Sequence, residues 1–125
     1  MNVNLNSAYL MIKSVLPNMK SKNYGRVINI SSDADHIGFA EAGAYCASKF
    51  GLLGLTEAVR KELIGNDISF TVISPGRVDT NFNNKKPGDR PVSLKAEDVA
   101  VQVAHLLELR ENCNIETIRL KSTLE

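Results

Sequence analysis

The stretch AYCASKFGLLGLTEAVRKEL, residues 44–63, begins with small residues and continues with apolar residues at helical spacing. Apolar side chains three and four positions apart share one face of an α-helix, so this stretch predicts an amphipathic helix over residues 44–64. Gly65 and Asn66 follow, and both residue types commonly end helices. Near the start of the helix, Tyr45 and Lys49 lie four residues apart, so a phenol and an ammonium share one face.

A short strand is predicted on each side of this helix. RVINIS (residues 26–31) precedes it and ISFTVIS (residues 68–74) follows it, and both runs are rich in β-branched residues. Outside them the pattern predicts a first helix over residues 3–20, interrupted or bent near Pro17, a third helix over 99–107 and a third strand over 115–121. Strands separated by helices predict an α/β fold with a parallel sheet of three strands.

Composition and charge exclude several classes of function. The 125 residues fit one domain, and 43% of them are hydrophobic, which suffices for a core. Fifteen basic and fourteen acidic residues leave a net charge of +1. The basic residues form no long run, so we expect neither nucleic acid nor a membrane surface as a partner.

The cysteines and the first residues bear on localisation. Cys46 and Cys113 are far apart and lack CxxC spacing, so we expect no disulfide framework and no metal site. The apolar runs are shorter than a membrane span, and the N-terminal residues lack the basic region of a signal peptide. We therefore expect a cytoplasmic protein that is neither exported nor anchored.

The pairing of Tyr45 with Lys49 has two interpretations. A nearby cation favours phenolate over phenol, so Lys49 would make Tyr45 a better general acid near neutral pH. The same spacing also occurs on many helices as a half-buried ring beside a solvated amine, with no chemistry attached. The pair alone leaves both interpretations open.

Three further elements accompany the pair at fixed separations. Ser32 in INISS lies thirteen residues before Tyr45, and Asn4 in VNLNSAY lies twenty-eight residues before Ser32. SPGRVDT, residues 74–80, follows the second predicted strand. Together with YCASK, these elements resemble the short-chain dehydrogenase/reductase family over residues 2–120. The resemblance implies a Rossmann-type, doubly wound parallel sheet, of which this chain would hold three strands with flanking helices.

The resemblance also implies a reaction and roles for four residues. Hydride would pass between a nicotinamide cofactor, NAD or NADP, and the carbon of a small-molecule carbonyl or alcohol. Tyr45 would transfer the matching proton, and Ser32 would donate a hydrogen bond to the substrate oxygen. Lys49 would assist Tyr45 and hold the nicotinamide ribose, and Asn4 would support a water-linked proton path to Lys49.

Further residues are implied in cofactor binding, substrate choice and assembly. Besides Tyr45 and Lys49, the family pattern places a turn against the nicotinamide carboxamide, here Pro75, Gly76, Val78 and Thr80. Substrate specificity would lie largely in residues 81–93. Family members commonly pair through helices that correspond to residues 3–20 and 44–64, so a homo-oligomer is expected.

The chain also departs from the family pattern. None of its eight glycines forms the TGxxxGxG turn that binds the cofactor pyrophosphate, and the residue that would select NAD or NADP is missing. We therefore expect residues 1–125 to be the C-terminal half of one NAD(P)-binding Rossmann domain. The alternatives are a truncated, inactive fragment and a non-catalytic assembly module. In-frame codons for TGxxxGxG upstream of Met1 would distinguish them.

Overall fold

The computed structural model describes residues 2–79 and 93–124, and for residues 2–4 and 79 it describes the backbone alone. Three α-helices, one short 3-10 helix (η1) and five strands follow one another in these ranges. In chain order they are α1 (Asn2–Lys22), β1 (Tyr24–Ile30), η1 (Asp33–Asp35), α2 (Gly43–Glu62), β2 (Asp67–Pro75), β3 (Val78–Asp79), β4 (Leu94–Lys95), α3 (Ala96–Leu107) and β5 (Thr117–Leu120).

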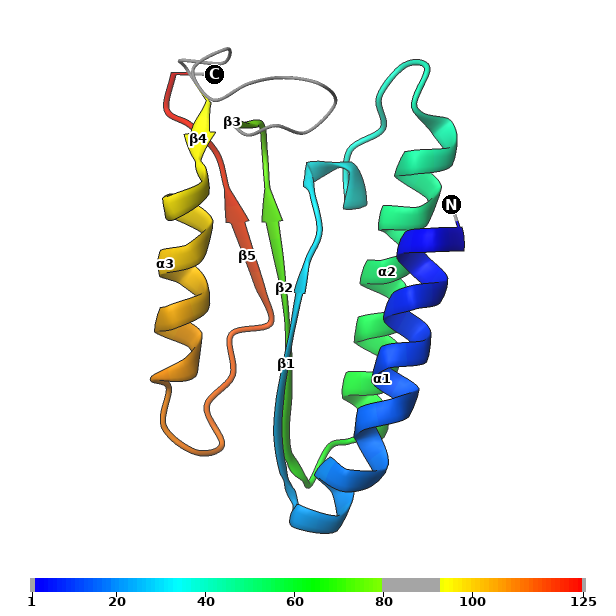
Figure 1. The fold of residues 1–125 in the computed structure, drawn as a ribbon, viewed down its shortest axis with the longest axis vertical. Helices are drawn as coiled ribbons and strands as arrows, with labels where there is room; N and C mark the ends of the chain where they lie inside the picture. Colours follow the sequence, from blue (N-terminus) through cyan, green and yellow to red (C-terminus); the bar gives the residue numbers. More distant parts are fainter. Residues whose placement is uncertain (1, 80–92, 125) are drawn as a thin grey trace.

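The main sheet is parallel, with strand order β1-β2-β5. β1 and β2 pair from Tyr24 opposite Asp67 to Ile30 opposite Ile73, and β2 and β5 pair from Val72 opposite Thr117 onward. Helices α1 and α2 cover one face of this sheet, and α3 lies on the other (Figure 1). The predicted α/β class and the parallel three-stranded sheet are confirmed.

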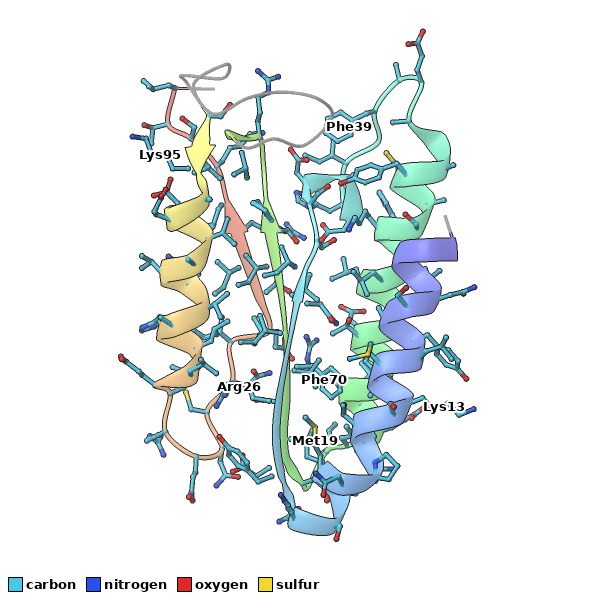
Figure 2. All side chains as sticks on the ribbon, in the orientation of Figure 1. Lys13, Met19, Arg26, Phe39, Phe70 and Lys95 are labelled. Atoms are coloured by element: carbon cyan, nitrogen blue, oxygen red, sulfur yellow. The ribbon has the colours of Figure 1, made fainter. Side chains whose placement is uncertain are left out.

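The core lies between the sheet and the pair of helices α1 and α2. Ile12, Leu63, Ile68 and Phe70 form a buried cluster there, and Met19 is among the side chains packed against it. Figure 2 shows Phe70 and Met19 pointing into this layer, whereas Lys13 points away from it. β2 is the central strand and is buried from Ile68 to Pro75, as expected of a strand covered on both faces.

Several boundaries differ from those predicted. α1 continues through Pro17 without interruption, and Pro17 is exposed, so the lost backbone hydrogen bond falls on the side that faces water. α3 begins three residues earlier than expected, because the Asp98 carboxylate accepts a hydrogen bond from the Lys95 backbone N–H at 2.7 Å and caps the helix. The small parallel sheet of β3 and β4 was not predicted. Much of the expected specificity segment, residues 80–92, lies outside the described residues.

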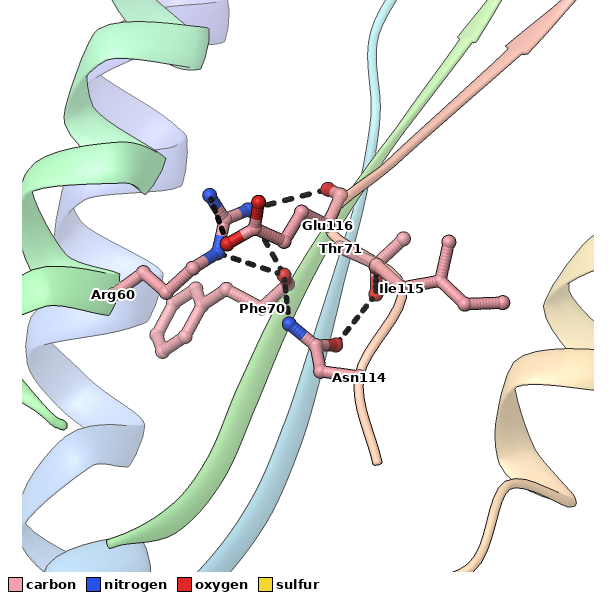
Figure 3. Close-up of polar contacts among 6 residues, drawn as sticks. All are labelled: Arg60, Phe70, Thr71, Asn114, Ile115 and Glu116. Atoms are coloured by element: carbon pink, nitrogen blue, oxygen red, sulfur yellow. Dashed lines mark hydrogen bonds and ion pairs between the residues drawn. The ribbon is translucent and has the colours of Figure 1, made fainter. Parts of the chain in front are cut away.

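A polar cluster joins α2, β2 and the segment before β5 (Figure 3). The Arg60 guanidinium donates to the backbone carbonyl of Phe70 at 3.0 Å and to that of Glu116 at 3.2 Å. Asn114 also donates to the Phe70 carbonyl, and the Thr71 hydroxyl donates to the carbonyl of Ile115 at 2.7 Å. These bonds fix the approach of the chain to β5.

One edge of the main sheet is formed by β1. Within residues 2–79 and 93–124, no strand pairs with β1 on the side opposite β2. β1 is therefore an edge strand in the described part of the structure. Unpaired backbone groups along such an edge are available to another strand.

Candidate active site

The carboxyl ends of β1 and β2 meet at the end of the sheet where α2 begins (Figure 1). η1 follows β1 directly and packs against both α2 and β2. This packing places the segment of Ser32 beside the first turns of α2, where Tyr45 and Lys49 lie. Ligands of open α/β sheets bind at the carboxyl ends of the strands, so this end is the natural place for a site.

Tyr45 and Lys49 lie one helical turn apart on α2, as their spacing predicts. The Lys49 ammonium lies 5.7 Å from the centroid of the Tyr45 ring. Tyr45 remains 37% exposed, whereas Lys49 is only 9% exposed. The phenol is thus open to a bound molecule, while the ammonium sits beneath it in a partly desolvated position.

Burial and a nearby carboxylate act on Lys49 in opposite directions. Desolvation lowers the pKa of Lys49 from its ordinary value, because burial penalises the charged form, and the carboxylate of Asp35 offsets part of this effect. No ion pair closer than 4 Å joins Lys49 to any described residue. Lys49 is therefore a largely buried residue whose ammonium can still donate hydrogen bonds to a bound molecule.

Ser32 forms the N-cap of η1. Its hydroxyl oxygen accepts a hydrogen bond from the backbone N–H of Ala34 at 2.9 Å, which fixes the side chain at the end of β1. A hydroxyl that accepts through its oxygen still carries a proton to donate. Ser32 can therefore donate to a substrate oxygen while it caps η1.

Asp35 is a residue of this site that the sequence analysis missed. It is 1% exposed, and it accepts a hydrogen bond from the hydroxyl of Ser74 at the end of β2. Its other carboxylate oxygen lies 2.6 Å from Nδ1 of His36. The only signal in the sequence is an acidic residue three positions after Ser32, which by itself is typical of a solvated loop.

The Pro75–Gly76 turn leaves the sheet at the same end. The Gly76 N–H donates to the carbonyl of Leu120 at 2.8 Å, which ties the turn to β5. Val78 lies in β3, opposite Leu94. Thr80, the last residue of the predicted turn, lies outside the described residues.

Asn4 lies in α1, and its side chain is outside the described part of the structure. The neighbouring Leu5 packs against Gly51 of α2, because a Cβ atom added at Gly51 would come 3.0 Å from Leu5 Cδ2. Gly51 follows Lys49 by two residues. The backbone of Asn4 is thus next to a residue of α1 that packs on α2 two positions after Lys49.

Residues 2–79 and 93–124 provide neither a metal site nor a membrane span. There, no three or more His, Cys, Asp and Glu side chains gather in a way that would hold a metal ion. Among the same residues, no helix combines the length and apolar character needed to cross a membrane.

Comparison with known proteins extends this description. The model of a family described as "short chain dehydrogenase" matches residues 1–91. Dehydrogenase/reductase SDR family member 6 of Aquarana catesbeiana is 41% identical over 92 residues, which are 73% of this chain and 38% of that protein. The 3-oxoacyl-[acyl-carrier-protein] reductase of Pseudomonas aeruginosa is 38% identical over 86 residues, 69% of this chain and 35% of the reductase.

A solved structure matches over almost the whole chain. The alcohol dehydrogenase of the archaeon Thermococcus sibiricus, in complex with 5-hydroxy-NADP, superimposes with a TM-score of 0.88 at 28% sequence identity. The match covers 98% of this chain and 52% of that one. The chain thus spans about half the length of such structures and less than half the length of the curated relatives it matches.

Proposed function

Because the chain belongs to the short-chain dehydrogenase family, we propose that it is the catalytic half of an NAD(P)-dependent oxidoreductase that interconverts a carbonyl and an alcohol. The observation that carries the proposal is the exposed Tyr45 phenol over the buried Lys49 ammonium, at the sheet end where Ser32 caps η1. In this proposal residues 1–125 form the C-terminal half of a single Rossmann domain.

The groups at this end of the sheet fit the nicotinamide part of a dinucleotide. Among the described residues, Lys49 has no ion pair, and the hydroxyl of Ser31 is buried without a hydrogen-bond partner. Such groups favour a polar ligand, because a buried polar atom without a partner is costly. The hydroxyls of a ribose and the amide of a carboxamide can form hydrogen bonds with the Lys49 ammonium and the Ser31 hydroxyl.

Lys49 with Tyr45 would hold the ribose, and the turn of Pro75, Gly76, Val78 and Thr80 would face the carboxamide. A bound NAD(H) or NADP(H) supplies or accepts the hydride. The complex of the Thermococcus alcohol dehydrogenase with 5-hydroxy-NADP supports a cofactor of this class. None of the eight glycines of this chain forms the turn that would bind a pyrophosphate. In this proposal a segment outside residues 1–125 binds it.

The remaining chemistry falls to side chains of this chain. Ser32 donates its hydroxyl proton in a hydrogen bond to the substrate oxygen and stabilises the negative charge that develops there. Tyr45 gives its phenolic proton to the same oxygen during reduction and takes it back during oxidation. The Lys49 ammonium stabilises the phenolate that remains on Tyr45. Asn4 supports reprotonation through water near Lys49.

The experiment that tests these roles separates binding from turnover. A chimera would join the N-terminal half of the Pseudomonas aeruginosa reductase to residues 1–125, and carbonyl reduction and NADPH binding would be measured. Tyr45→Phe should abolish reduction and affect binding only slightly, because it removes the proton donor and one ribose contact while Lys49 keeps the other. Lys49→Ala should weaken both. Tyr24→Phe, at an exposed tyrosine of β1, is the matched control. A Tyr45→Phe chimera with turnover equal to that of the control would refute the assignment.

Assembly is a second candidate function, and the surface of α1 favours it. Tyr9, Leu10 and Met11 are adjacent on α1 and are all exposed. Consecutive helical residues point in directions about 100° apart, so these apolar side chains spread over the outer surface of α1 and favour a contact with another protein. We propose that α1 and α2 form a homo-oligomer interface, which can accompany catalysis or exist without it.

A further inference from the structure

We propose that Asp35 is a positioning residue of the candidate active site: its buried carboxylate joins η1, whose N-cap is Ser32, to Ser74 at the end of β2. The inference rests on the proposed function for its role in catalysis. It concerns a residue outside the set of Asn4, Ser32, Tyr45 and Lys49.

The geometry of Asp35 is that of a fixed group. The residue is almost fully buried, and each of its two carboxylate oxygens has a partner, Ser74 Oγ on one side and His36 Nδ1 on the other. A carboxylate held from two directions has one orientation. Its charge therefore lies at a defined place between η1, α2 and the end of β2.

The bond between Asp35 and Ser74 links the two segments that the proposed reaction needs. Ser32 lies three residues before Asp35, and Pro75 and Gly76 directly follow Ser74. The bond thus ties the segment proposed to hold the substrate oxygen to the turn proposed to face the nicotinamide. Small errors in the spacing of reacting groups are costly to catalysis, so a buried tie at this point has a functional consequence.

The charge of Asp35 acts on the ammonium beneath Tyr45. Burial lowers the pKa of Lys49, and the Asp35 carboxylate is the group that raises it. Beside Lys49, α2 itself contributes the Tyr45 phenol, and η1 contributes Asp35, whose carboxylate also contacts His36 and the Ser74 hydroxyl of β2. Removal of the Asp35 charge leaves the desolvation of Lys49 without this compensation, so Lys49 loses its proton at lower pH.

The test measures the titration of Lys49 directly and requires no turnover. The 125-residue chain would be labelled with [ε-¹³C]lysine, the Lys49 signal assigned with Lys49→Arg, and its midpoint followed by NMR. Asp35→Asn, which keeps a side chain of the same size, should move the midpoint to lower pH. Asp33→Asn removes a carboxylate from the same turn and should leave the midpoint unchanged. Ser74→Ala keeps the charge and should produce a smaller shift than Asp35→Asn.

Two results would overturn the inference. An Asp35→Asn midpoint equal to that of Asp33→Asn would show that the Asp35 charge does not reach Lys49. An Asp35→Asn shift no larger than that of Ser74→Ala would show that packing, and not charge, acts on the ammonium.

A second variant decides the case in which Asp35→Asn does not fold. The double variant Asp35→Asn/Lys49→Met removes both charges, so it should recover the fold if they compensate each other. A double variant that also fails to fold contradicts the inference. The oxidoreductase proposal fails separately, through turnover that is independent of Tyr45, while the titration of Lys49 would still depend on Asp35.

Discussion

Lys49 is the residue at which burial and charge compete most directly. The residue is largely buried, and desolvation lowers the pKa of Lys49 more than the Asp35 carboxylate raises it. The folded state therefore binds this proton less tightly than the unfolded chain does. Between the lowered pKa of the folded state and the ordinary value of 10.5, the unfolded chain holds more protons at this site, so stability rises with pH.

The lowered pKa of Lys49 predicts how the stability of the fold changes with pH. We compare the free energy of unfolding of the unchanged chain with that of Lys49→Met. The unchanged chain should gain stability relative to the variant as the pH rises toward 10.5. The reason is that the cost of the buried charge is present at neutral pH and is relieved as Lys49 deprotonates. Urea unfolding at several pH values measures the difference. Lys61→Met, at an exposed position of α2, should show no such trend.

For single residues, spacing in the sequence was enough to predict that Tyr45 and Lys49 lie close together. Tyr45 and Lys49 are a turn apart because both lie in one regular helix, and a helix fixes that geometry from the sequence alone. Asp35 was not foreseen, because its burial depends on how η1, α2 and β2 pack together. A carboxylate in the run DADH is ordinarily solvated, and nothing in the run itself indicates that Ser74 would meet it.

At the scale of elements, the packing of α1 on β1 depends on Gly25. Gly25 is buried, and a Cβ atom at this position would come 2.6 Å from Met19 Cγ and 3.0 Å from Met19 Cβ. The side chain of Met19 therefore occupies the space that any larger residue would need.

We predict that Gly25→Ala lowers the free energy of unfolding by about 1–3 kcal/mol through overpacking. Met19→Ala removes the overlapping atoms, so Gly25→Ala should cost much less in that background. Chemical unfolding of the four chains gives the coupling between the two positions. Gly54→Ala is the control, because a Cβ atom there meets nothing within 4 Å and lies in a helix. Equal costs of Gly25→Ala in both backgrounds would contradict the account.

The cluster around Arg60 gives a second prediction at this scale. Arg60 donates to the carbonyls of Phe70 and Glu116 and so joins α2, β2 and the approach to β5 (Figure 3). Arg60→Met removes the Arg60 bonds, although Asn114 still donates to the Phe70 carbonyl and the Val72 N–H to that of Glu116, and it should cost about 1–3 kcal/mol in the free energy of unfolding. Lys61→Met should change it by less than about 0.5 kcal/mol. Equal effects of the two variants would show that the cluster contributes nothing to stability.

The long elements were predictable and the short ones were not. α2 and β2 have apolar patterns long enough to define a period, and their observed bounds lie within a few residues of those predicted. η1, β3 and β4 are two or three residues long, so no period exists for the sequence to reveal. The extension of α3 to Ala96 depends on one capping carboxylate, that of Asp98, which a search for apolar periodicity does not detect.

At the scale of the whole molecule, two surfaces are suited to association. β1 has an edge that no described strand covers, and α1 presents the exposed side chains of Tyr9, Leu10 and Met11. Both features favour contacts between chains. The apolar side chains on α1 agree with the helix-mediated assembly that we propose.

We predict that the 125-residue chain associates in a concentration-dependent manner. Sedimentation velocity at several concentrations measures this, and Leu10→Lys should weaken the association. Leu107→Lys is the matched control, because Leu107 is 65% exposed on α3 and Leu10 is 61% exposed on α1. A compact monomer at all concentrations would contradict the prediction.

A further prediction concerns cofactor affinity. The 125 residues hold groups suited to the nicotinamide end, but none of their glycines forms a turn for the pyrophosphate. The chain alone should therefore bind NADH and NADPH weakly by calorimetry, and the chimera should bind one of them much more tightly. Micromolar binding by the chain alone would show that it has a cofactor site of its own.

The central claim is that Tyr45 supplies the proton for a hydride transfer to a carbonyl carbon. The most direct test gives the chimera NADH or NADPH that carries deuterium at C4 of the nicotinamide, together with a panel of ketones, and analyses the alcohols by mass spectrometry. We expect deuterated alcohol from the chimera with the unchanged residues 1–125 and from Tyr24→Phe, and none above background from Tyr45→Phe. Equal deuterium incorporation by Tyr45→Phe and the unchanged chimera would contradict the central claim.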